Sequence, residues 1–420
     1  MFSRFDMPLW SIGLIVAIDV IAILRAVTRA HGVQKTLAWL FAIVAAPGVG
    51  AFLYLTLANP SIRRKTRRMS ARRQSLRDSP VCARTASGGA APLTEAYAPL
   101  FVLAANATGL PCTFENRLEL LAEDVRAFQQ LESALSLAKR SIWAEYYIVR
   151  NDATGRRFLE LLELRARQGI EVRFLYDAVG SWWIDPRRTR AIRTAGGRVE
   201  AFLPLNPLRR RWAVHLRNHR KVVIVDGELA FTGGMNVGDE YSGRARRRGG
   251  TTFRDTHLSL SGPAVADLAQ IFVEDWSYAT GETLALPAPP EAPPPRTSTV
   301  AIVPSGPDQE HNASQLVYFS AINTARARLW LTSPYFIPDE TILRALVAAA
   351  LRNIDVRLLV PARSDVWFAC LAARSYFDAL AKAGVRIFEY QPTMMHAKTL
   401  LVDDALALVG SANLDVRSIV

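Results

Sequence analysis

Cysteine is scarce in this chain. Its three cysteines among 420 residues, Cys82, Cys112 and Cys370, lie far apart in the sequence. An odd number at wide spacing argues against a disulfide framework and against a zinc site, and it suits a reducing compartment. Hydrophobic residues, by contrast, make up half of the chain. A chain of this length and composition can bury more than one core and is not globally disordered.

Acidic residues are few near the N-terminus. Residues 1–80 hold 12 Lys and Arg but 3 Asp and Glu, so +9 of the net charge of +13 lies there. The other 340 residues carry only +4. A nucleic-acid enzyme would concentrate its positive charge on the working domain. The excess lies instead beside the most hydrophobic part of the chain, so we expect a membrane as the partner and no nucleic acid.

Two long hydrophobic runs occupy residues 1–60, which we expect to form a transmembrane helical hairpin. The run Met7–Leu24 contains one charge, Asp19, whereas Leu37–Leu57 contains none. A helix needs about 20 apolar residues to cross a bilayer, so the second run is the clearer span, with a kink expected at Pro47. Asp19 is costly in lipid, which leaves a cleaved signal peptide as the alternative for the first run. No clean small-x-small cleavage pattern follows that run.

Eight basic residues follow the second run, between Arg63 and Arg77. The positive-inside rule places them in the cytoplasm, so we expect a multi-pass membrane protein whose remaining chain is cytoplasmic. We interpret the basic run as an anchor on anionic lipid head groups. Residues 61–111 are then a basic juxtamembrane segment and a linker rich in small residues.

Two globular regions follow, 112–283 and 299–420, separated by a proline-rich linker at 284–298. Each contains a short helix and a strand, then an apolar-periodic helix and a buried strand, predicted at 170–176 and at 354–360. The order strand, helix, strand implies parallel pairing with a helical crossover. The predicted fold class is therefore α/β: two repeats, each a mixed sheet flanked by helices, after the N-terminal hairpin.

The same motif closes each repeat. The stretch HRKVVIVDGELAFTGGMN begins at His219, and HAKTLLVDDALALVGSAN begins at His396, 177 residues later. An Asp between two apolar runs predicts a β-hairpin, along which side chains alternate between faces. The His and Lys of each copy therefore share a face. We count Asp226 and Asp403 with the candidate catalytic residues as members of the motif, although the alternation predicts a structural role for them at the turns.

The two copies together supply a set of polar side chains suited to a phosphodiester. Lysines and short polar donors can hold the non-bridging oxygens, one imidazole can attack phosphorus, and the other can protonate the leaving oxygen. We therefore expect each copy to supply half of one active site. No Asp, Glu and His cluster with metal-ligand spacing accompanies the motifs, so no metal and no cofactor are expected. The candidate catalytic residues are His219, Lys221, Asp226, His396, Lys398 and Asp403, and the candidate substrate-binding residues are Asn236, Ser411 and Asn413.

The paired motifs resemble those of the phospholipase D superfamily. The stretches GGMNVGDEY, FRDTH and SPYFIPDE and the hydrophobic N-terminus are similar to bacterial cardiolipin synthases of that superfamily, over nearly the whole chain. The resemblance implies a two-repeat α/β sandwich and metal-independent exchange at a phosphodiester through a phosphohistidine. It further implies a bacterial cytoplasmic membrane protein that binds phosphatidylglycerol and other anionic lipids and makes cardiolipin and glycerol from two phosphatidylglycerol molecules. Protein partners are not predicted.

The resemblance also implies roles for individual residues. His219 would be the nucleophile and His396 the general acid, and a carboxylate would orient each histidine. Asp255, in FRDTH, is the expected match for His219. The carboxylate expected with the second motif would fall beyond Val420, so the second repeat is expected to be truncated.

Three functions remain open at this point. They are a membrane-bound phosphatidyltransferase, a phospholipase D-type hydrolase or nuclease with the same pocket, and an inactive truncated family member. The hydrophobic runs favour a lipid over a nucleic acid as substrate. Nine arginines near the first motif are expected to form a solvated basic face, from which some could recruit anionic lipid: Arg209, Arg210, Arg211, Arg217, Arg220, Arg244, Arg246, Arg247 and Arg248.

Overall fold

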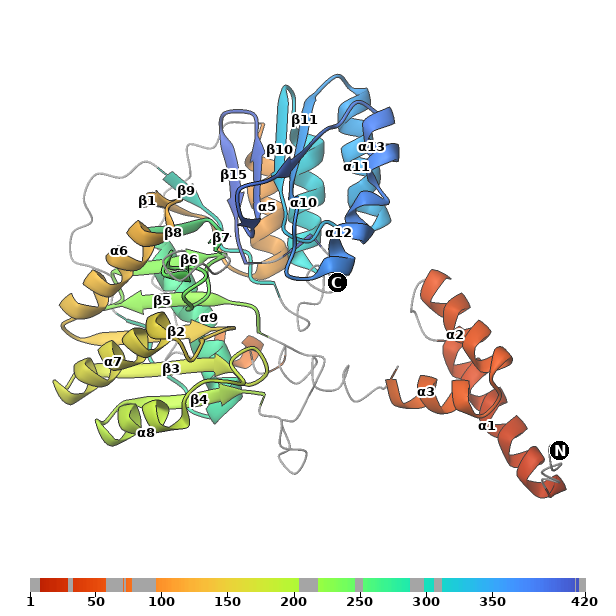
Figure 1. Cartoon of the computed structure of the whole chain (residues 1–420), viewed down its shortest axis with the longest axis horizontal. Coiled ribbons are helices and arrows are strands. Elements are labelled where there is room, and N and C mark those ends of the chain that lie inside the picture. Colours follow the sequence, from red (N-terminus) through yellow and green to blue (C-terminus); the bar gives the residue numbers. More distant parts are fainter. Residues whose placement is uncertain are drawn as a thin grey trace. The chain divides into compact units, whose positions relative to one another are not determined.

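The computed structural model divides the chain into two compact units, residues 1–68 and 69–420 (Figure 1). It describes residues 8–28, 33–57, 71, 73–77, 96–203, 218–245, 252–287, 298–305, 312–411 and 413–414. Several residues discussed above lie outside the described residues. They are Cys82, most of the proline-rich linker at 284–298, the basic residues Arg63, Arg64, Lys65, Arg67, Arg68 and Arg72, and Arg209, Arg210, Arg211, Arg217, Arg246, Arg247 and Arg248.

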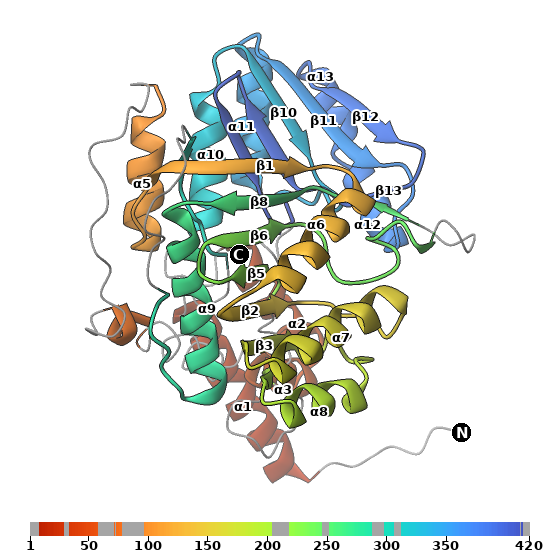
Figure 2. The ribbon, with the colours of Figure 1, turned by 90° about the vertical axis from the view of Figure 1, so that its left-hand side faces the viewer.

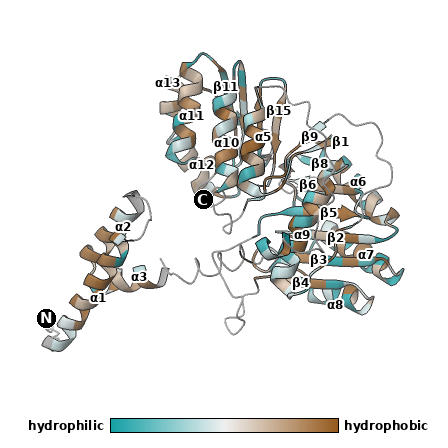
Figure 3. Cartoon of the chain, turned by 180° about the vertical axis from the view of Figure 1, so that it is seen from behind, coloured by the Kyte–Doolittle hydropathy of each residue, from teal (hydrophilic) through white to brown (hydrophobic). Residues whose placement is uncertain are grey.

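The first unit is built from three apolar helices, α1 (Leu9–Thr28), α2 (Val33–Ala45) and α3 (Val49–Leu57), which are largely hydrophobic along their length (Figure 3). Within the described residues, one helix is long and apolar enough to cross a membrane, over Trp10–Thr28. The second hydrophobic run, predicted as the clearer span, forms two shorter helices, and its crossing of the membrane stays a prediction. Proline lacks the N–H that continues a helix, and Gly48 has a φ of 76°, so the run breaks into α2 and α3.

Asp19 lies where this break occurs. The carboxylate of Asp19 accepts a hydrogen bond of 2.9 Å from the backbone N–H of Gly48. A helix start leaves backbone N–H groups without partners, and a carboxylate can satisfy one of them. Small and apolar side chains pack the three helices together around this point: Ala22, Ala26, Ile43, Ala51 and Tyr54 are buried.

The second unit contains two large sheets with matching strand orders. The eight-stranded sheet has the order β4-β3-β2-β5-β6-β8-β1-β9, and the five-stranded sheet has the order β12-β11-β10-β14-β15. The first five strands of the eight-stranded sheet thus match, in order, the whole five-stranded sheet. Figure 2 shows β1, β8, β6, β5, β2 and β3 of the first repeat one above another. The strands of the first sheet are β1 (Thr113–Leu121), β2 (Ser141–Tyr146), β3 (Glu171–Asp177), β4 (Arg198–Phe202), β5 (Lys221–Val225), β6 (Leu229–Gly233), β8 (His257–Ser261) and β9 (Ser298–Val300). Those of the second are β10 (Arg328–Thr332), β11 (Asp355–Pro361), β12 (Arg386–Tyr390), β14 (Thr399–Val402) and β15 (Leu406–Val409).

The predicted duplication and the parallel crossovers are confirmed. β2 pairs in parallel with β3, and β10 pairs in parallel with β11. The crossover helices are α7 (Ala153–Arg167) and α11 (Glu340–Leu351). The strands begin one residue later than predicted, because Ile170 and Ile354 end the preceding loops.

Helices cover both faces of the first sheet. α6 (Asp124–Leu137), α7 and α8 (Pro186–Thr194) contribute side chains to one core, and α9 (Ala264–Thr280) packs on the other face, where Phe272 stacks on Trp143 at 5.4 Å. The second sheet is covered by α10 (Ala313–Thr324), α11, α12 (Trp367–Arg374) and α13 (Phe377–Lys382).

The segment predicted to be a linker contains a core helix. α5 (Ala98–Thr108) places Leu100 and Ala104 in the core of the second repeat, although it precedes the first repeat in the sequence. β9 likewise pairs with β1 of the first sheet, although it lies at the start of the second predicted repeat. Neither docking is encoded in the local sequence pattern, because both depend on partners far along the chain.

A two-stranded ladder joins the repeats. β7 (Phe253–Arg254) pairs in parallel with β13 (Met394–Met395), and the backbone N–H of His396 donates to the carbonyl of Arg254 at 2.8 Å. This ladder places the stretch FRDTH of the first repeat against the start of the motif of the second.

Candidate active site

The two motifs form the predicted hairpins, and their aspartates lie at the turns. Asp226 and Asp403 have positive φ angles of 57° and 52°. The Asp226 carboxylate accepts hydrogen bonds from the backbone N–H groups of Lys139, Arg140 and Ser141, at the start of β2. The Asp403 carboxylate does the same before β10, accepting from Arg326, Ala327 and Arg328. These contacts support the structural role, and a part for either aspartate in the reaction stays a prediction.

The other motif residues lie at the opposite end of the same strands. Lys221 pairs with Tyr146 at the last position of β2. The imidazole of His219 stacks on the ring of Tyr147, with centroids 4.0 Å apart and planes at 18°. The Nζ of Lys221 donates to the carbonyl of His219 at 2.7 Å and lies 5.5 Å from the centre of the Tyr147 ring. The aromatic ring therefore holds both side chains of the first half-site.

In the second half-site, Asp255 contacts His396. The Nδ1 of His396 lies 2.6 Å from Oδ2 of Asp255, and the Nζ of Lys398 lies 3.6 Å from the same oxygen. The prediction that Asp255 belongs with His219 is corrected by this geometry. The reason is the β7–β13 ladder, which carries a carboxylate of the first repeat to the histidine of the second.

The ring of His396 is enclosed by aromatic side chains. Phe253 stacks on it at 5.4 Å, and Tyr241 and Tyr335 meet it edge-on at 5.5 Å and 6.2 Å. Three neighbouring rings and a carboxylate on Nδ1 fix the orientation of this imidazole. Its other nitrogen, Nε2, lies 3.2 Å from Nζ of Lys398.

The charges of the two half-sites act on one another. Burial lowers the pKa of Lys221 to about 7, and the charge of Lys398 lowers it as well, whereas Asp255 acts in the opposite direction. Burial also lowers the pKa of Lys398 to about 8, and burial together with the Lys398 charge lowers the pKa of His396 to about 4. Burial alone would raise the pKa of Asp255, but Lys398 and His396 hold it below its usual value. The Asp255 carboxylate therefore opposes the loss of charge from both motif lysines.

The predicted substrate-binding residues differ in their surroundings. Asn236 is buried, and its amide binds the protein itself: Oδ1 accepts from the N–H of Ile148 at 3.2 Å, and Nδ2 donates to the hydroxyl of Tyr241 at 3.0 Å. Asn413 is also buried, and its Oδ1 has no hydrogen-bond partner among the described residues. Ser411 is half-buried. Substrate binding by these three residues stays a prediction.

Two glycines and a histidine of the site escaped the sequence analysis. A Cβ on Gly234 would overlap the carboxylate of Asp255, and a Cβ on Gly233 would lie 2.8 Å from Nδ1 of His257. His257 is buried, burial lowers its pKa to about 4, and neither ring nitrogen has a hydrogen-bond partner within the described residues. The spacing of Asp255 and His257 was an available signal, because residues two apart in an extended segment share a face.

Several arginines expected to face lipid or solvent are internal. The buried guanidinium of Arg220 pairs with Asp275 and donates to the carbonyl of Ser305. Arg73 lies 3.2 Å from Glu274 and 3.1 Å from Asp275, and Arg77 lies 2.7 Å from Glu274. The lipid-anchor interpretation is therefore wrong for Arg73 and Arg77, and Arg220 does not lie on a solvated face, because buried carboxylates of α9 pair with all three. Arg244 is more exposed and lies 3.8 Å from Glu132.

No group of three or more His, Cys, Asp and Glu side chains is placed to hold a metal ion in the part of the chain that the structure describes. The Nζ of Lys398 lies 3.6 Å from Oδ2 of Asp255, and Lys221 is the lysine of the other motif. Such a set can neutralise a phosphodiester and hold its oxygens.

Comparison with known families identifies similar sequences. The family described as cardiolipin synthase, PLD-like domain, matches residues 131–276 and 318–420, and a phospholipase D-nuclease N-terminal family matches residues 14–58.

Curated relatives are similar over most of the chain. A cardiolipin synthase of Alkalihalophilus pseudofirmus is 38% identical over 91% of this chain and 77% of its own length. One of Geobacillus kaustophilus is 41% identical over 78% of this chain and 65% of its own length. A cardiolipin synthase A of Pseudomonas aeruginosa is 38% identical over 95% of this chain and 81% of its own length.

A solved structure shares the fold. The crystal structure of a phosphatidylserine synthase of Haemophilus influenzae aligns with a TM-score of 0.55 and 15% identity, covering 76% of this chain and 84% of that one.

Proposed function

The chain belongs to the family of cardiolipin synthases with phospholipase D-like domains, and we propose that it makes cardiolipin and glycerol from two phosphatidylglycerol molecules at one site shared by its two repeats. The observation that carries this proposal is the contact of Asp255 with both His396 and Lys398. That contact joins a carboxylate of the first repeat to the motif of the second, 141 residues later. A site with two imidazoles and two lysines matches the needs of a phosphodiester exchange.

In the first step, a ring nitrogen of His219 attacks the phosphorus of phosphatidylglycerol. The bond from phosphorus to the glycerol oxygen breaks, and His396 gives its proton to that oxygen, so free glycerol leaves. Lys221 and Lys398 hold the non-bridging oxygens as charge shifts onto them. Tyr147 supports the nucleophile by stacking on its ring at 4.0 Å.

In the second step, the head-group hydroxyl of another phosphatidylglycerol attacks the phosphatidyl-histidine. Its proton passes to His396, the phosphorus–nitrogen bond breaks, and cardiolipin forms with both histidines restored. Asp255 on Nδ1 directs the other nitrogen of His396 to the substrate and stabilises its charged form. An anionic phosphodiester in the site raises the low pKa of His396 for the acid step.

The proposal includes the placement of the chain. We propose a multi-pass protein of the bacterial cytoplasmic membrane, with a hairpin at 1–60 in which α1 and the broken pair α2 and α3 cross, and with the repeats at 112–283 and 299–420 in the cytoplasm. The packing of α1 against α2 and α3 supports the hairpin, and the basic residues after it support the orientation. Phosphatidylglycerol and other anionic lipids are the partners, not nucleic acid.

The activity test uses purified full-length protein in vesicles of labelled phosphatidylglycerol, with and without EDTA. We expect labelled cardiolipin and free glycerol in both samples. Phosphatidic acid as the main product would identify a hydrolase instead, and loss of turnover on chelation that a divalent ion restores would contradict the metal-independent mechanism.

The histidine roles are tested by trapping labelled phosphoenzyme, formed from a nitrophenyl phosphodiester and denatured with SDS at alkaline pH, where the phosphorus–nitrogen bond survives. A good leaving group departs unprotonated, so His396→Ala should retain label and His219→Ala should lose it. The opposite result would exchange the two roles, and no label in the unaltered chain would support the inactive alternative.

A further inference from the structure

Two large aromatic side chains are exposed beside the first half-site. Trp182 and Trp183 follow β3, and 59% and 72% of their surfaces are accessible to solvent. They lie in the turn that leads into α8. Tryptophan is normally among the most buried residues, so an adjacent exposed pair calls for an explanation.

The second repeat carries a matching cluster at the matching place. Trp367, Phe368 and Leu371 of α12 follow β11, the counterpart of β3, and are 73%, 59% and 56% exposed. α12 is inverted relative to an ordinary surface helix, since its small residues Ala369 and Ala373 are the buried ones. Large apolar side chains on the outer face are typical of helices that lie in a membrane interface.

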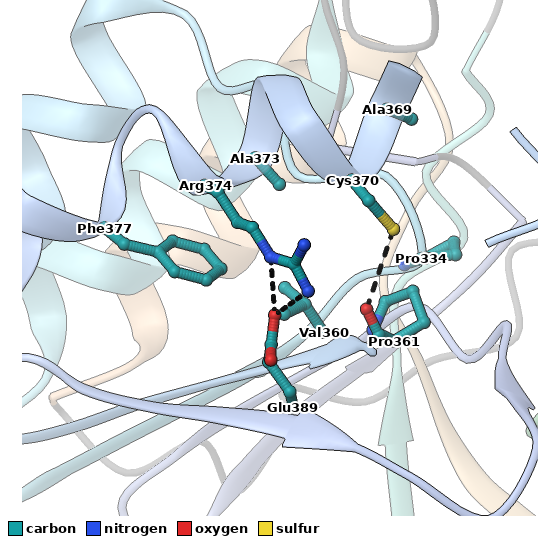
Figure 4. A pocket seen from close by; sticks show the side chains of 9 residues that line it. All are labelled: Pro334, Val360, Pro361, Ala369, Cys370, Ala373, Arg374, Phe377 and Glu389. Carbon is teal, nitrogen blue, oxygen red and sulfur yellow. Dashed lines mark hydrogen bonds and ion pairs between the residues drawn. The ribbon is translucent and has the colours of Figure 1, made fainter. Parts of the chain in front are cut away.

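α12 packs against the second sheet through two polar contacts. Arg374 forms an ion pair of 2.8 Å with Glu389 of β12, and Cys370 faces the carbonyl of Pro361 at 3.8 Å (Figure 4). The small cavity between these residues contains no motif residue. The inner face of α12 is thus occupied by its own sheet, and the aromatic face points away from it.

In the first repeat, a short chain of contacts connects the exposed pair to the motif histidine. The Oγ of Ser181 donates to the carbonyl of Tyr147 at 2.9 Å, and Tyr147 stacks on His219. Asp177 accepts from the N–H groups of Val179 and Gly180 at 2.9 Å, so the turn before Trp182 is held in place.

In the second repeat, a tyrosine likewise connects the exposed cluster to the motif histidine. The hydroxyl of Tyr335 donates to Asp365 at 2.7 Å, and the ring of Tyr335 meets His396 edge-on at 6.2 Å. Asp365 lies two residues before Trp367. Each aromatic cluster therefore stands at the rim of its own half-site, one tyrosine away from the reacting histidine.

Exposed basic side chains accompany both clusters. Arg187 and Arg190 follow Trp183 on α8, and Arg363 precedes Trp367. Aromatic rings at the head-group level together with cations are the composition that binds an anionic membrane surface. A second protein would not require the same arrangement on both sides of a lipid-consuming site, whereas a bilayer that delivers two lipids would.

We propose that these two rim clusters, Trp182–Trp183 and Trp367–Phe368–Leu371, insert into the interface of the phospholipid bilayer and hold the mouth of the site against the membrane. The proposal rests on the proposed lipid substrate. Insertion lets a phosphatidylglycerol reach the site with its acyl chains still in the bilayer, so that the head group alone has to enter.

The test compares two substrates with full-length protein and two double variants, Trp182→Ala/Trp183→Ala and Trp367→Ala/Phe368→Ala. One substrate is phosphatidylglycerol in vesicles, and the other is dihexanoyl phosphatidylglycerol below its micelle concentration. Each variant should lose about tenfold in the ratio of vesicle to monomer turnover, because only the first substrate needs the interface. The matched control is Leu137→Ala/Leu351→Ala, which removes side chains 70% and 68% exposed at the other end of each sheet and should leave the ratio unchanged.

A second readout does not depend on turnover. Tryptophan fluorescence of the full chain in vesicles with brominated acyl chains should be quenched, and less so in each Trp double variant. An unchanged ratio with unchanged quenching, or equal losses on both substrates, would overturn the proposal. The proposal would also be overturned if quenching stayed unchanged while light scattering showed that the variants lose a dimer formed by the unaltered chain. The clusters would then bind a second copy of the chain. If the unaltered chain turns over neither substrate, the proposed function fails, and the quenching still decides the insertion.

Discussion

At the residue scale, the aspartate of each motif illustrates how a motif residue can serve folding alone. The Asp226 carboxylate binds three backbone N–H groups at the start of β2, whereas Lys221 pairs with the end of that strand. Asp226→Asn removes the charge and one acceptor oxygen, so we expect a loss of about 1–2 kcal/mol in the free energy of unfolding. Turnover per folded molecule should stay near that of the unaltered chain.

Thermal unfolding and activity of the same preparation check this expectation. Asp403→Asn serves as the matched variant in the second repeat and should behave alike, because its carboxylate has the same kind of backbone partners. Unchanged melting with abolished turnover would mean that these carboxylates act in the reaction.

Gly234 makes room for the carboxylate that the site is built around. An added methyl group would overlap Asp255, so Gly234→Ala should displace Asp255 from His396 and reduce turnover about 10- to 100-fold, as loss of a partner that orients a reacting group does. It should also lower stability. In the double variant Gly234→Ala/Asp255→Ala the overlap is gone, so the melting temperature should recover relative to Gly234→Ala. If the two losses simply add, the glycine and the carboxylate do not compete for space.

The lowered lysine pKa values predict how anion binding depends on pH. A bound anion needs charged lysines, and in the free protein Lys221 loses its proton near pH 7 and Lys398 near pH 8. The dissociation constant of tungstate, whose own charge is constant in this range, should rise about tenfold per pH unit above about 7 and more steeply above about 8. Titration calorimetry measures it. Lys221→Met should remove the first break, and a flat profile between pH 6 and 9 would contradict the role of both lysines.

At the element scale, alternation and turn chemistry predicted the hairpins, and the repeat predicted the parallel crossovers. These features follow from local periodicity, so they were accessible in the sequence. The partner of Asp255 could not be predicted from local periodicity. The β7–β13 ladder that places Asp255 against His396 joins segments 141 residues apart. The second hydrophobic run shows the same limit. The kink at Pro47 was expected, but the contact of the Asp19 carboxylate with Gly48, which completes the break, joins residues 29 positions apart and could not be predicted from composition.

Asp19 can be tested as the cap of α3. Asp19→Leu removes the acceptor for the N–H of Gly48 and should lower the local stability of α3 by about 1 kcal/mol. Because of this loss, amide exchange in the first turn of α3 should become several-fold faster. Asp19→Asn keeps an acceptor oxygen and should retain the protection. Hydrogen exchange of the full chain in nanodiscs gives the comparison. Equal protection in both variants would show that the break does not depend on this side chain.

At the scale of the whole molecule, contacts between distant segments complete what each repeat begins. α5 enters the core of the second repeat from a position before the first, and the helical segment 73–77 docks on α9. Arg73 also reaches Asp275, which pairs with Arg220 next to His219. Through these ion pairs, the segment 73–77 contacts the residue that follows His219 in the first half-site. Sequence patterns could not reveal this, because a basic run beside a membrane has the same composition whether it faces lipid or buried carboxylates.

The two interpretations of that basic run make opposite predictions. Glu274 is fully buried, and Arg73 and Arg77 supply its charge partners, so Arg73→Met/Arg77→Met leaves a buried carboxylate without either of them. Breaking a buried pair in this way costs about 3–5 kcal/mol, whereas Arg126→Met, which removes an exposed partner of Glu119, should cost at most about 1 kcal/mol. Adding Glu274→Gln to the double variant should restore much of the loss, because the uncompensated charge is then removed. Chemical unfolding in detergent measures the free energy of unfolding of these three variants and of the unaltered chain. If the double variant instead unfolds like the unaltered chain and loses only salt-dependent binding to anionic vesicles, these arginines serve the membrane and not the fold.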